Sequence, residues 1–140
     1  GDFRLLLNGL IPLDDFTEDN GATYFLPGSH KFDDKPADAA FFATSERLRA
    51  RAGDIFMFDS NMWHAAGENR TDTVRRGLTL TFSRPFFKQQ LDLPRYLGRK
   101  YASNLSPHAR QILGYNAQTP ATISEFYQPA DKRAYKPGQE

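Results

Sequence analysis

The chain has 140 residues, enough for one domain with a buried core of its own. Acidic and basic side chains are interspersed and nearly balanced, with a formal net charge of +1, so there is no basic footprint for nucleic acid. The sequence has no run of 18 apolar residues and no charged-then-apolar leader, and it therefore predicts neither a membrane span nor a signal peptide.

Cysteine is absent, which excludes disulfide bonds and thiolate metal sites and fits a reducing compartment, so we expect a cytoplasmic protein. The 12 phenylalanines stand beside 10 glycines and 9 prolines. Aromatic residues with frequent turn formers favour short strands over long helices. The first residue is Gly rather than Met and an apolar run begins almost at once, so we expect a piece of a longer protein.

Residues 4–11 form a near-continuous apolar stretch, and its length and the following Pro12 predict a buried strand. The Asp-Asn-Gly turn signal at 19–21 predicts that residues 23–26 return as the second strand of a hairpin. Residues 31–46 are polar and irregular, and we expect them to form a surface excursion.

Strands are predicted again at 47–51 and 54–59, and the segment 76–83 alternates with the period of a strand. Arg75 has the parity of the polar face of this last strand, whereas Arg76 points the opposite way. The apolar face carries Leu78, Leu80 and Phe82, and the polar face carries Gly77, Thr79, Thr81 and Ser83.

Helices are predicted only after these strands, over residues 94–104 and 106–113. Ser106 suits the N-cap of the second helix and Gly114 suits its C-terminal exit. Residues 128–140 read as a polar tail with little fixed structure.

The segment 53–76 carries the strongest functional signal. A Gly-Asp turn begins an apolar run that ends in Trp63-His64, and a polar loop leads from there to Arg75. If the two flanking strands are neighbours, the imidazole and the guanidinium face a shared cavity. An imidazole can hold a metal, and a guanidinium can hold a carboxylate through two parallel hydrogen bonds. Taken alone, each residue is more often structural or at the surface.

The other polar candidates favour ordinary structural roles. Asn69 and Thr71 are expected to shape their loop through side-chain to backbone hydrogen bonds. His30 reads as structural and His108 as exposed. Four acidic residues on one loop favour a solvated turn over a general acid–base set, namely Asp14, Asp15, Glu18 and Asp19.

A set of motifs follows in a fixed order along the chain: NGATYFLPGSHK at 20–31, GDIFMF at 53–58, Trp63-His64, Asn69-Arg70-Thr71, Arg75 and LGY at 113–115. This ordered combination resembles the phytanoyl-CoA dioxygenase family. The resemblance implies a mainly β, double-stranded β-helix (a jelly-roll, cupin-like barrel) with C-terminal helices. It also implies Fe(II) as cofactor and 2-oxoglutarate as co-substrate. The product of 2-oxoglutarate would be succinate, and relatives act on fatty acyl-CoA, compatible solutes and antibiotic precursors.

The resemblance also assigns roles to individual residues. His64 matches the distal histidine of the iron triad and is thus the catalytic metal ligand of this chain. Arg75 matches the arginine that pairs with the distal carboxylate of 2-oxoglutarate. Asn8, on the first strand, matches a position that often contacts the co-substrate, and Thr79 is assigned to the same lining.

One departure from the family is plain, because the chain contains no His-x-Asp motif for the first two iron ligands. Asp2 would fill that role only with a His before Gly1. One histidine cannot make the arrangement of two histidines and one carboxylate. We therefore expect residues 1–140 to be a single domain that is the C-terminal part of such an oxygenase. Its barrel would be incomplete, and the missing N-terminal half or a second chain would complete it.

Three functions follow as alternatives. The first is an Fe(II)/2-oxoglutarate-dependent dioxygenase that oxidises, by hydroxylation, a small organic molecule. The second is a non-catalytic cupin-like binding or interaction domain, a degenerate oxygenase without the His-x-Asp ligands. The third is a metal-dependent cupin isomerase without redox chemistry, which the joint presence of His64 and Arg75 disfavours.

Overall fold

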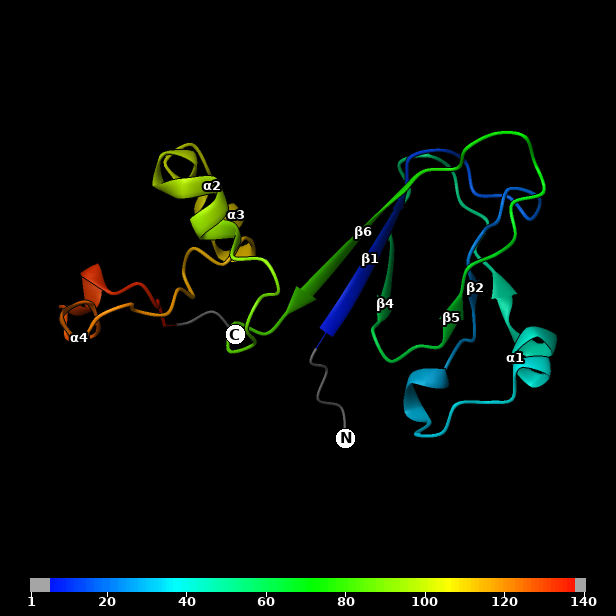
Figure 1. Cartoon of the computed structure of the whole chain (residues 1–140), viewed down its shortest axis with the longest axis horizontal. Coiled ribbons are helices and arrows are strands. Elements are labelled where there is room, and N and C mark those ends of the chain that lie inside the picture. Colours follow the sequence, from blue (N-terminus) through cyan, green and yellow to red (C-terminus); the bar gives the residue numbers. More distant parts are fainter. Residues whose placement is uncertain (1–5, 138–140) are drawn as a thin grey trace. The chain divides into compact units, whose positions relative to one another are not determined.

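The structure is a computed structural model that describes residues 6–137. The chain divides into two compact units, Gly1–Phe82 and Ser83–Glu140. Strands dominate the first unit and helices the second (Figure 1). The described residues thus have a mixed, mostly β architecture in the part that carries the candidate site. The single domain expected over residues 1–140 stays a prediction.

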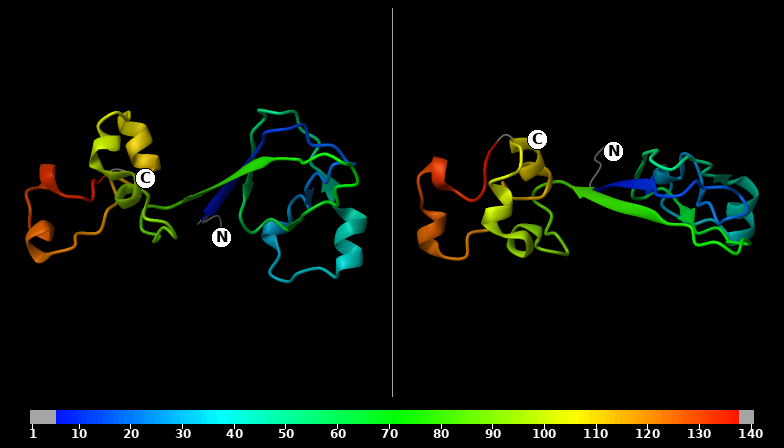
Figure 2. Two further views of the ribbon diagram at one scale, coloured as in Figure 1. Left: turned by 45° about the horizontal axis from the view of Figure 1, so that its top comes forward. Right: turned by 90° about the horizontal axis from the view of Figure 1, so that it is seen from above.

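The described residues of the first unit form two three-stranded sheets, with the orders β4-β1-β6 and β3-β2-β5. The pairs β1–β4, β2–β3 and β2–β5 are antiparallel. The strands β1 and β6 lie side by side in every view (Figure 2). The bounds are Leu6–Pro12 for β1, Tyr24–Phe25 for β2, Glu46–Arg47 for β3, Phe56–Asp59 for β4, His64–Ala65 for β5 and Gly77–Ser83 for β6.

The predicted hairpin between residues 4–11 and 23–26 is wrong, because β1 and β2 belong to different sheets. Between these strands the chain crosses from one sheet to the other. Phe16 fixes this crossing, since its N–H donates to the Ala50 carbonyl at 2.8 Å and its own carbonyl accepts from Ala50 N at 3.2 Å. The turn signal reverses the chain locally but does not select the strand that becomes the pairing partner.

The core of the first unit is a small cluster, which we call the core cluster: Leu10, Phe16, Ala22, Phe25 and Phe58. A Cβ added to Gly77 would lie 2.9 Å from the Phe16 ring and 3.6 Å from Leu10. The face of β6 that carries Gly77 and the threonines is therefore turned toward the core cluster. The apolar face of β6 is turned away from it and is partly exposed, at 45 % for Leu78, 37 % for Leu80 and 36 % for Phe82.

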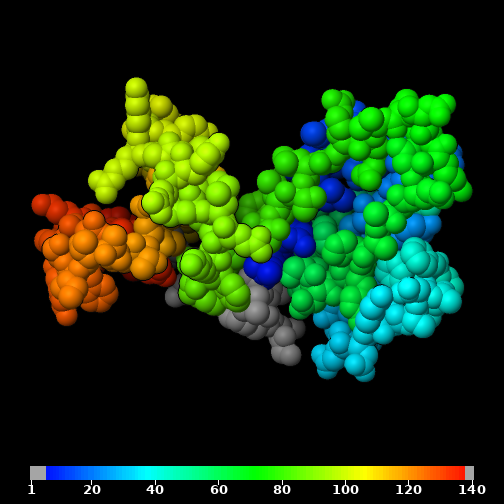
Figure 3. Space-filling view, in the orientation of Figure 1, coloured from blue at the N-terminus to red at the C-terminus, as the bar shows by residue number. Residues whose placement is uncertain are grey.

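The surface excursion predicted at 31–46 contains a helix that the sequence analysis missed. The helix α1 spans Asp38–Thr44, and a 3-10 turn, η1, spans Ser29–Lys31. Phe41 is the buried residue of α1, and this one anchor in an alanine-rich segment explains the helix. In the space-filling view these residues, coloured blue to cyan, form the lower edge of the first unit (Figure 3).

The second unit consists of short helices and loops. Both predicted helices are confirmed, and α2 is kinked at Gly98, where φ is +79°. Ser106 caps α3 by accepting a hydrogen bond from Ala109 N at 3.1 Å, and the chain leaves α3 through Gly114 at φ +87°. The bounds are Leu93–Ala102 for α2, Pro107–Ile112 for α3, Ile123–Phe126 for α4 and Ala130–Lys132 for the 3-10 turn η2.

The predicted polar tail has more regular structure than its composition suggests. Besides η2, its described part pairs with the preceding loop through a bridge between Ala117 and Tyr135. Residues 138–140 lie outside the described part of the chain. Among the helices of residues 6–137, none is both long and apolar enough to cross a membrane.

Candidate functional site

His64 begins a strand of its own, which corrects the expectation that it ends the apolar run at 54–59. The strand β4 ends at Asp59, and a turn follows in which Asp59 accepts hydrogen bonds from Asn61 N and Met62 N. His64 then opens β5 in the other sheet, opposite Phe25 of β2. Because this turn contains neither Gly nor Pro, the sequence analysis did not predict it and assigned His64 to the end of the preceding strand.

One ring nitrogen of His64 makes a hydrogen bond, and the other keeps its lone pair. Its Nδ1 lies 2.8 Å from the carbonyl oxygen of Met62. A carbonyl only accepts, so Nδ1 carries the proton in the neutral ring and Nε2 keeps its lone pair. The ring is stacked on Phe25 at 5.8 Å and meets the edge of Phe58 at 5.3 Å. A metal-binding histidine is usually oriented by a hydrogen bond from its other ring nitrogen to a carbonyl or carboxylate oxygen.

Arg75 lies on the core cluster, and Arg76 lies away from it. The Cζ atom of Arg75 is 4.1 Å from the centroid of the Phe16 ring. Its Nε atom is buried and has no hydrogen-bond partner within residues 6–137. Arg76 instead makes a two-point ion pair with Asp14, through Nε at 3.0 Å and a second guanidinium nitrogen at 2.7 Å. The divergence of the two arginines follows the strand parity read from the sequence.

The core cluster, not a pair of neighbouring strands, connects the two candidate residues. His64 belongs to β5, while Arg75 directly precedes β6 in the other sheet. The expectation of adjoining strands is therefore wrong. Each side chain nevertheless packs on phenylalanine rings of the same cluster, His64 on Phe25 and Phe58 and Arg75 on Phe16. The sequence analysis did not identify these rings as supports of the site.

The loop between His64 and Arg75 is held against the crossing between β1 and β2. Arg70 N donates to the Asp19 carbonyl at 2.7 Å, and its guanidinium pairs with the Asp19 carboxylate at 3.0 Å. A Cβ on Gly67 would lie 2.3 Å from the Ala22 carbonyl oxygen, so only glycine allows this approach. Asn69 accepts from Thr71 N, which confirms the predicted loop-shaping role.

The acidic residues of the first loop act as structural partners, as the solvated-turn interpretation predicted. Asp15 accepts from Ala52 N at 2.8 Å, and Glu18 pairs with Arg49. Asp14 pairs with Arg76, and Asp19 pairs with Arg70. Each of the four carboxylates thus has a structural partner, which favours the structural interpretation over a general acid–base set.

Asp14 is expected to make the free energy of unfolding fall more steeply as the pH is lowered. The hydrogen bonds from Arg76 lower the pKa of Asp14 from 3.8 to about 2. Because the folded-state pKa lies below the unfolded value, this stabilisation is fully present above about pH 4 and is lost as the pH falls through about 2. Urea midpoints measured from pH 5 to pH 2 should fall less steeply for Asp14→Asn than for the wild type. Asp33→Asn, an exposed carboxylate, should keep the wild-type slope, and equal slopes in all three would contradict the role of the pair.

Asn8 and Thr79 occupy the inner side of the β4-β1-β6 sheet. Asn8 is paired opposite Phe58, and its Oδ1 accepts a hydrogen bond from the Thr81 hydroxyl at 2.8 Å. Thr79 shares the strand face of Thr81 and is exposed. Thr81 was read as part of this face but not as a partner of Asn8. The co-substrate roles of Asn8 and Thr79 stay predictions.

The described side chains supply only part of the ligand set that an iron site needs. His64 fits as one ligand because Nε2 is free of the Met62 contact. Within residues 6–137, no three His, Asp or Glu side chains come close enough together to hold a metal ion. Asp2 lies outside the described residues. The described chain therefore offers one ligand of a triad, not a complete site.

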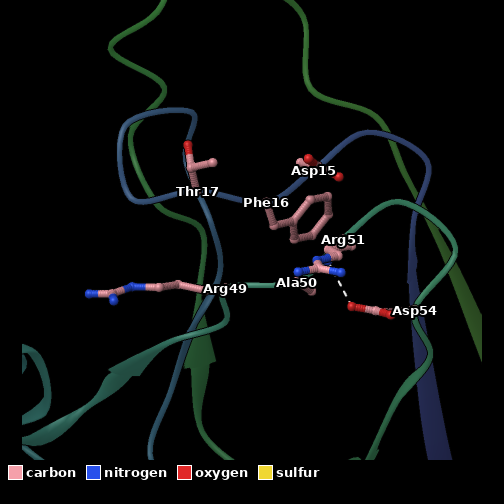
Figure 4. Close-up of a pocket in the computed structure, with 7 residues that line it drawn as sticks. All are labelled: Asp15, Phe16, Thr17, Arg49, Ala50, Arg51 and Asp54. Carbon is pink, nitrogen blue, oxygen red and sulfur yellow. Dashed lines mark hydrogen bonds between the residues drawn. The ribbon is translucent and has the colours of Figure 1, made fainter.

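A shallow pocket of about 580 Å³ lies elsewhere in the first unit (Figure 4). Its two acids are already engaged, since Asp15 accepts from Ala52 N and Asp54 accepts from Arg51 N at 2.7 Å. Neither His64 nor Arg75 lines it. The lining residues are Asp15, Phe16, Thr17, Arg49, Ala50, Arg51 and Asp54.

Two curated relatives were compared with this chain. The uncharacterised protein Rv1501 of Mycobacterium tuberculosis is 38 % identical over 145 residues, which cover 99 % of this chain and 53 % of that protein. The dioxygenase cdmA of Talaromyces verruculosus is 35 % identical over 118 residues, which cover 84 % of this chain and 39 % of cdmA. The chain thus spans about half the length, or less, of these relatives.

Solved structures show the same partial likeness. AviO1 from Streptomyces viridochromogenes Tue57 matches with a TM-score of 0.52 and 28 % identity, over 61 % of this chain and 39 % of AviO1. HygX from Streptomyces hygroscopicus, solved with nickel, 2-oxoglutarate and hygromycin B bound, matches with a TM-score of 0.53 and 19 % identity. That match covers 59 % of this chain and 37 % of HygX and concerns the fold alone.

A family comparison covers more than half of the chain. The sequence pattern of the phytanoyl-CoA dioxygenase (PhyH) family matches residues 2–77, the stretch that contains His64, Arg75 and the core cluster. The chain belongs to the phytanoyl-CoA dioxygenase family.

Proposed function

We propose that these residues form part of an Fe(II)- and 2-oxoglutarate-dependent dioxygenase that hydroxylates a small organic molecule. The observation that carries the proposal is the buried Nε of Arg75, which lies over Phe16 without a hydrogen-bond partner among residues 6–137. A buried donor without an acceptor is costly, and a carboxylate matches the planar guanidinium. The distal carboxylate of 2-oxoglutarate is the acceptor that membership of the family suggests.

In this proposal each residue has one task. His64 supplies Nε2 to the metal, and its bond to the Met62 carbonyl holds the ring in the required tautomer. Arg75 anchors the co-substrate, and Asn8 and Thr79 line the same side of the sheet. Arg75 lies over the Phe16 ring, and this apolar contact limits water at the buried Nε, which would strengthen an arginine–carboxylate pair.

Bound iron would supply the oxidising chemistry that couples the loss of CO₂ from 2-oxoglutarate to hydroxylation of the substrate. The chain's own residues bind, orient and exclude water. Since this chain offers one ligand, we propose that the complete double-stranded β-helix takes its His-x-Asp ligands from a segment outside these residues or from a second chain. That segment would also cover the partly exposed apolar face of β6.

The test compares two polypeptides, the complete gene product and residues 1–140 alone. With Fe(II) and 2-oxoglutarate under anaerobic conditions, the complete product is expected to develop a metal-to-ligand absorption band, and to release succinate once oxygen is admitted. Residues 1–140 alone should bind iron weakly and release no succinate. His64→Ala in the complete product should weaken iron binding by at least about a hundredfold, more than the loss of an outer-shell partner. His108→Ala, at an exposed position of α3, is the matched control and should have no effect.

The same experiment decides between the alternatives. A complete gene product that binds neither iron nor 2-oxoglutarate would favour the non-catalytic cupin-like binding domain. Iron binding without 2-oxoglutarate binding would favour the cupin isomerase. Succinate release from residues 1–140 alone would mean that a ligand was missed, with His30 and Asp2 the first to re-examine.

A further inference from the structure

Ser29 is a fully buried polar residue of the first unit. Its relative exposure is 0 %, although it carries a hydroxyl group and stands in a short 3-10 turn next to a loop. Most buried hydroxyl groups in proteins are hydrogen-bonded, so a partner for Ser29 is expected. The sequence analysis included this serine in the motif at 20–31 but gave it no role of its own.

The partner of Ser29 is the residue directly before His64. The Ser29 Oγ atom accepts a hydrogen bond from Trp63 N at 2.8 Å, across 34 positions of the sequence. The other polar backbone group of Trp63 is held by the same segment, because its carbonyl accepts from Leu26 N at 3.0 Å. Both backbone groups of Trp63 are therefore fixed by the chain that leaves β2.

The backbone at Gly28 explains how the serine reaches this position. Gly28 has φ +81°, a left-handed conformation that glycine adopts without strain, and it reverses the chain after Pro27. Ser29 then turns inward instead of continuing β2. The short turn that follows is closed by a hydrogen bond from Phe32 N to the Ser29 carbonyl at 3.0 Å.

Three constraints then meet on His64. The peptide before it is held by Ser29, its own backbone is paired opposite Phe25, and its Nδ1 is held by Met62. Of these, only the Ser29 hydroxyl comes from a side chain that can be removed without changing the imidazole or its strand partner. We infer that Ser29 is a positioning residue for the metal ligand, which sets the backbone angle from which His64 presents Nε2.

This inference rests on the proposed function, so its test has two separate readouts. The first is amide hydrogen exchange at Trp63 in the apo complete gene product, which reports the hydrogen bond and requires no metal. Exchange should be faster in Ser29→Ala and remain slow in Ser29→Thr, which keeps the hydroxyl. The second is titration with Co(II), followed by its visible absorption, at a temperature where circular dichroism shows every variant folded.

Ser29→Ala is expected to weaken Co(II) binding by roughly ten-fold to a hundred-fold and to change the shape of the absorption band, as for outer-shell partners of metal ligands. Ser29→Thr should bind closer to the wild type. Ser45→Ala is the matched control, since the Ser45 hydroxyl is also buried but has no hydrogen-bond partner among residues 6–137. Its Co(II) affinity should equal that of the wild type.

The outcomes separate the two claims. Unchanged Trp63 exchange in Ser29→Ala overturns the hydrogen bond itself. Faster exchange with unchanged Co(II) affinity and an unchanged band overturns the positioning role and leaves the proposed function standing. Failure of the wild type to bind Co(II), with the exchange result as expected, overturns the proposed function and with it this inference.

Discussion

Arg75→Ala in the complete gene product is expected to weaken 2-oxoglutarate binding by roughly thirty-fold to several-thousand-fold. Removal of the guanidinium would leave the distal carboxylate buried beside Phe16 without its partner. Breaking such a pair costs on the order of 2–5 kcal/mol, and about 1.4 kcal/mol corresponds to a factor of ten in affinity. Titration of 2-oxoglutarate into the Fe(II)-loaded protein under anaerobic conditions measures the loss directly.

Arg76→Ala is the matched control for this measurement. Arg76 is adjacent in sequence but pairs with Asp14 at the surface, away from the core cluster. Its 2-oxoglutarate affinity should change little, and iron affinity should change little in both variants because neither arginine is a ligand. Arg75→Lys keeps the charge but not the two-point geometry, and should fall between the wild type and alanine. Equal losses in Arg75→Ala and Arg76→Ala would contradict both the strand parity and the proposed co-substrate contact.

Phe16→Ala is expected to destabilise the first unit by about 3–5 kcal/mol, the usual loss for a buried phenylalanine. Phe16 is 2 % exposed, belongs to the core cluster and lies beneath Arg75. The loss is large beside a total stability of about 5–15 kcal/mol for an ordinary domain. Urea denaturation followed by circular dichroism gives the change in the free energy of unfolding.

Phe32→Ala provides the comparison, because Phe32 is 62 % exposed and its removal should cost about 0.5 kcal/mol or less. If Phe16→Ala does not fold, Phe16→Leu should fold with a loss on the order of 1 kcal/mol, because it fills most of the same space. Equal stability of Phe16→Ala and the wild type would mean that the core cluster does not carry the stability of this unit.

Several elements could be predicted from the sequence because their causes are local. The alternation at 76–83 identified β6 and sent Arg75 and Arg76 to opposite sides, since successive side chains of a strand point to opposite faces. Ser106 and Gly114 marked the ends of α3 through capping contacts within a few residues. The family was recognised from short motifs kept in order, a property of the sequence alone.

What the sequence could not predict are the pairings between distant segments. The turn at 19–21 was read correctly as a turn, yet β2 paired with β3 and β5 instead of β1. His64 was recognised, but its place in β5 depends on a turn after Asp59 that has no glycine or proline signal. The helix α1 was missed because a single buried Phe41 anchors it.

The sequence by itself thus determined the family, the local elements and the two residues most worth testing, His64 and Arg75. Only the tertiary structure placed both on one phenylalanine cluster and brought Ser29 to the backbone of Trp63. The physical reason is one of range. Strand periodicity, turns and helix caps act over a few residues, whereas sheet order and buried hydrogen bonds depend on the free energy of the whole core.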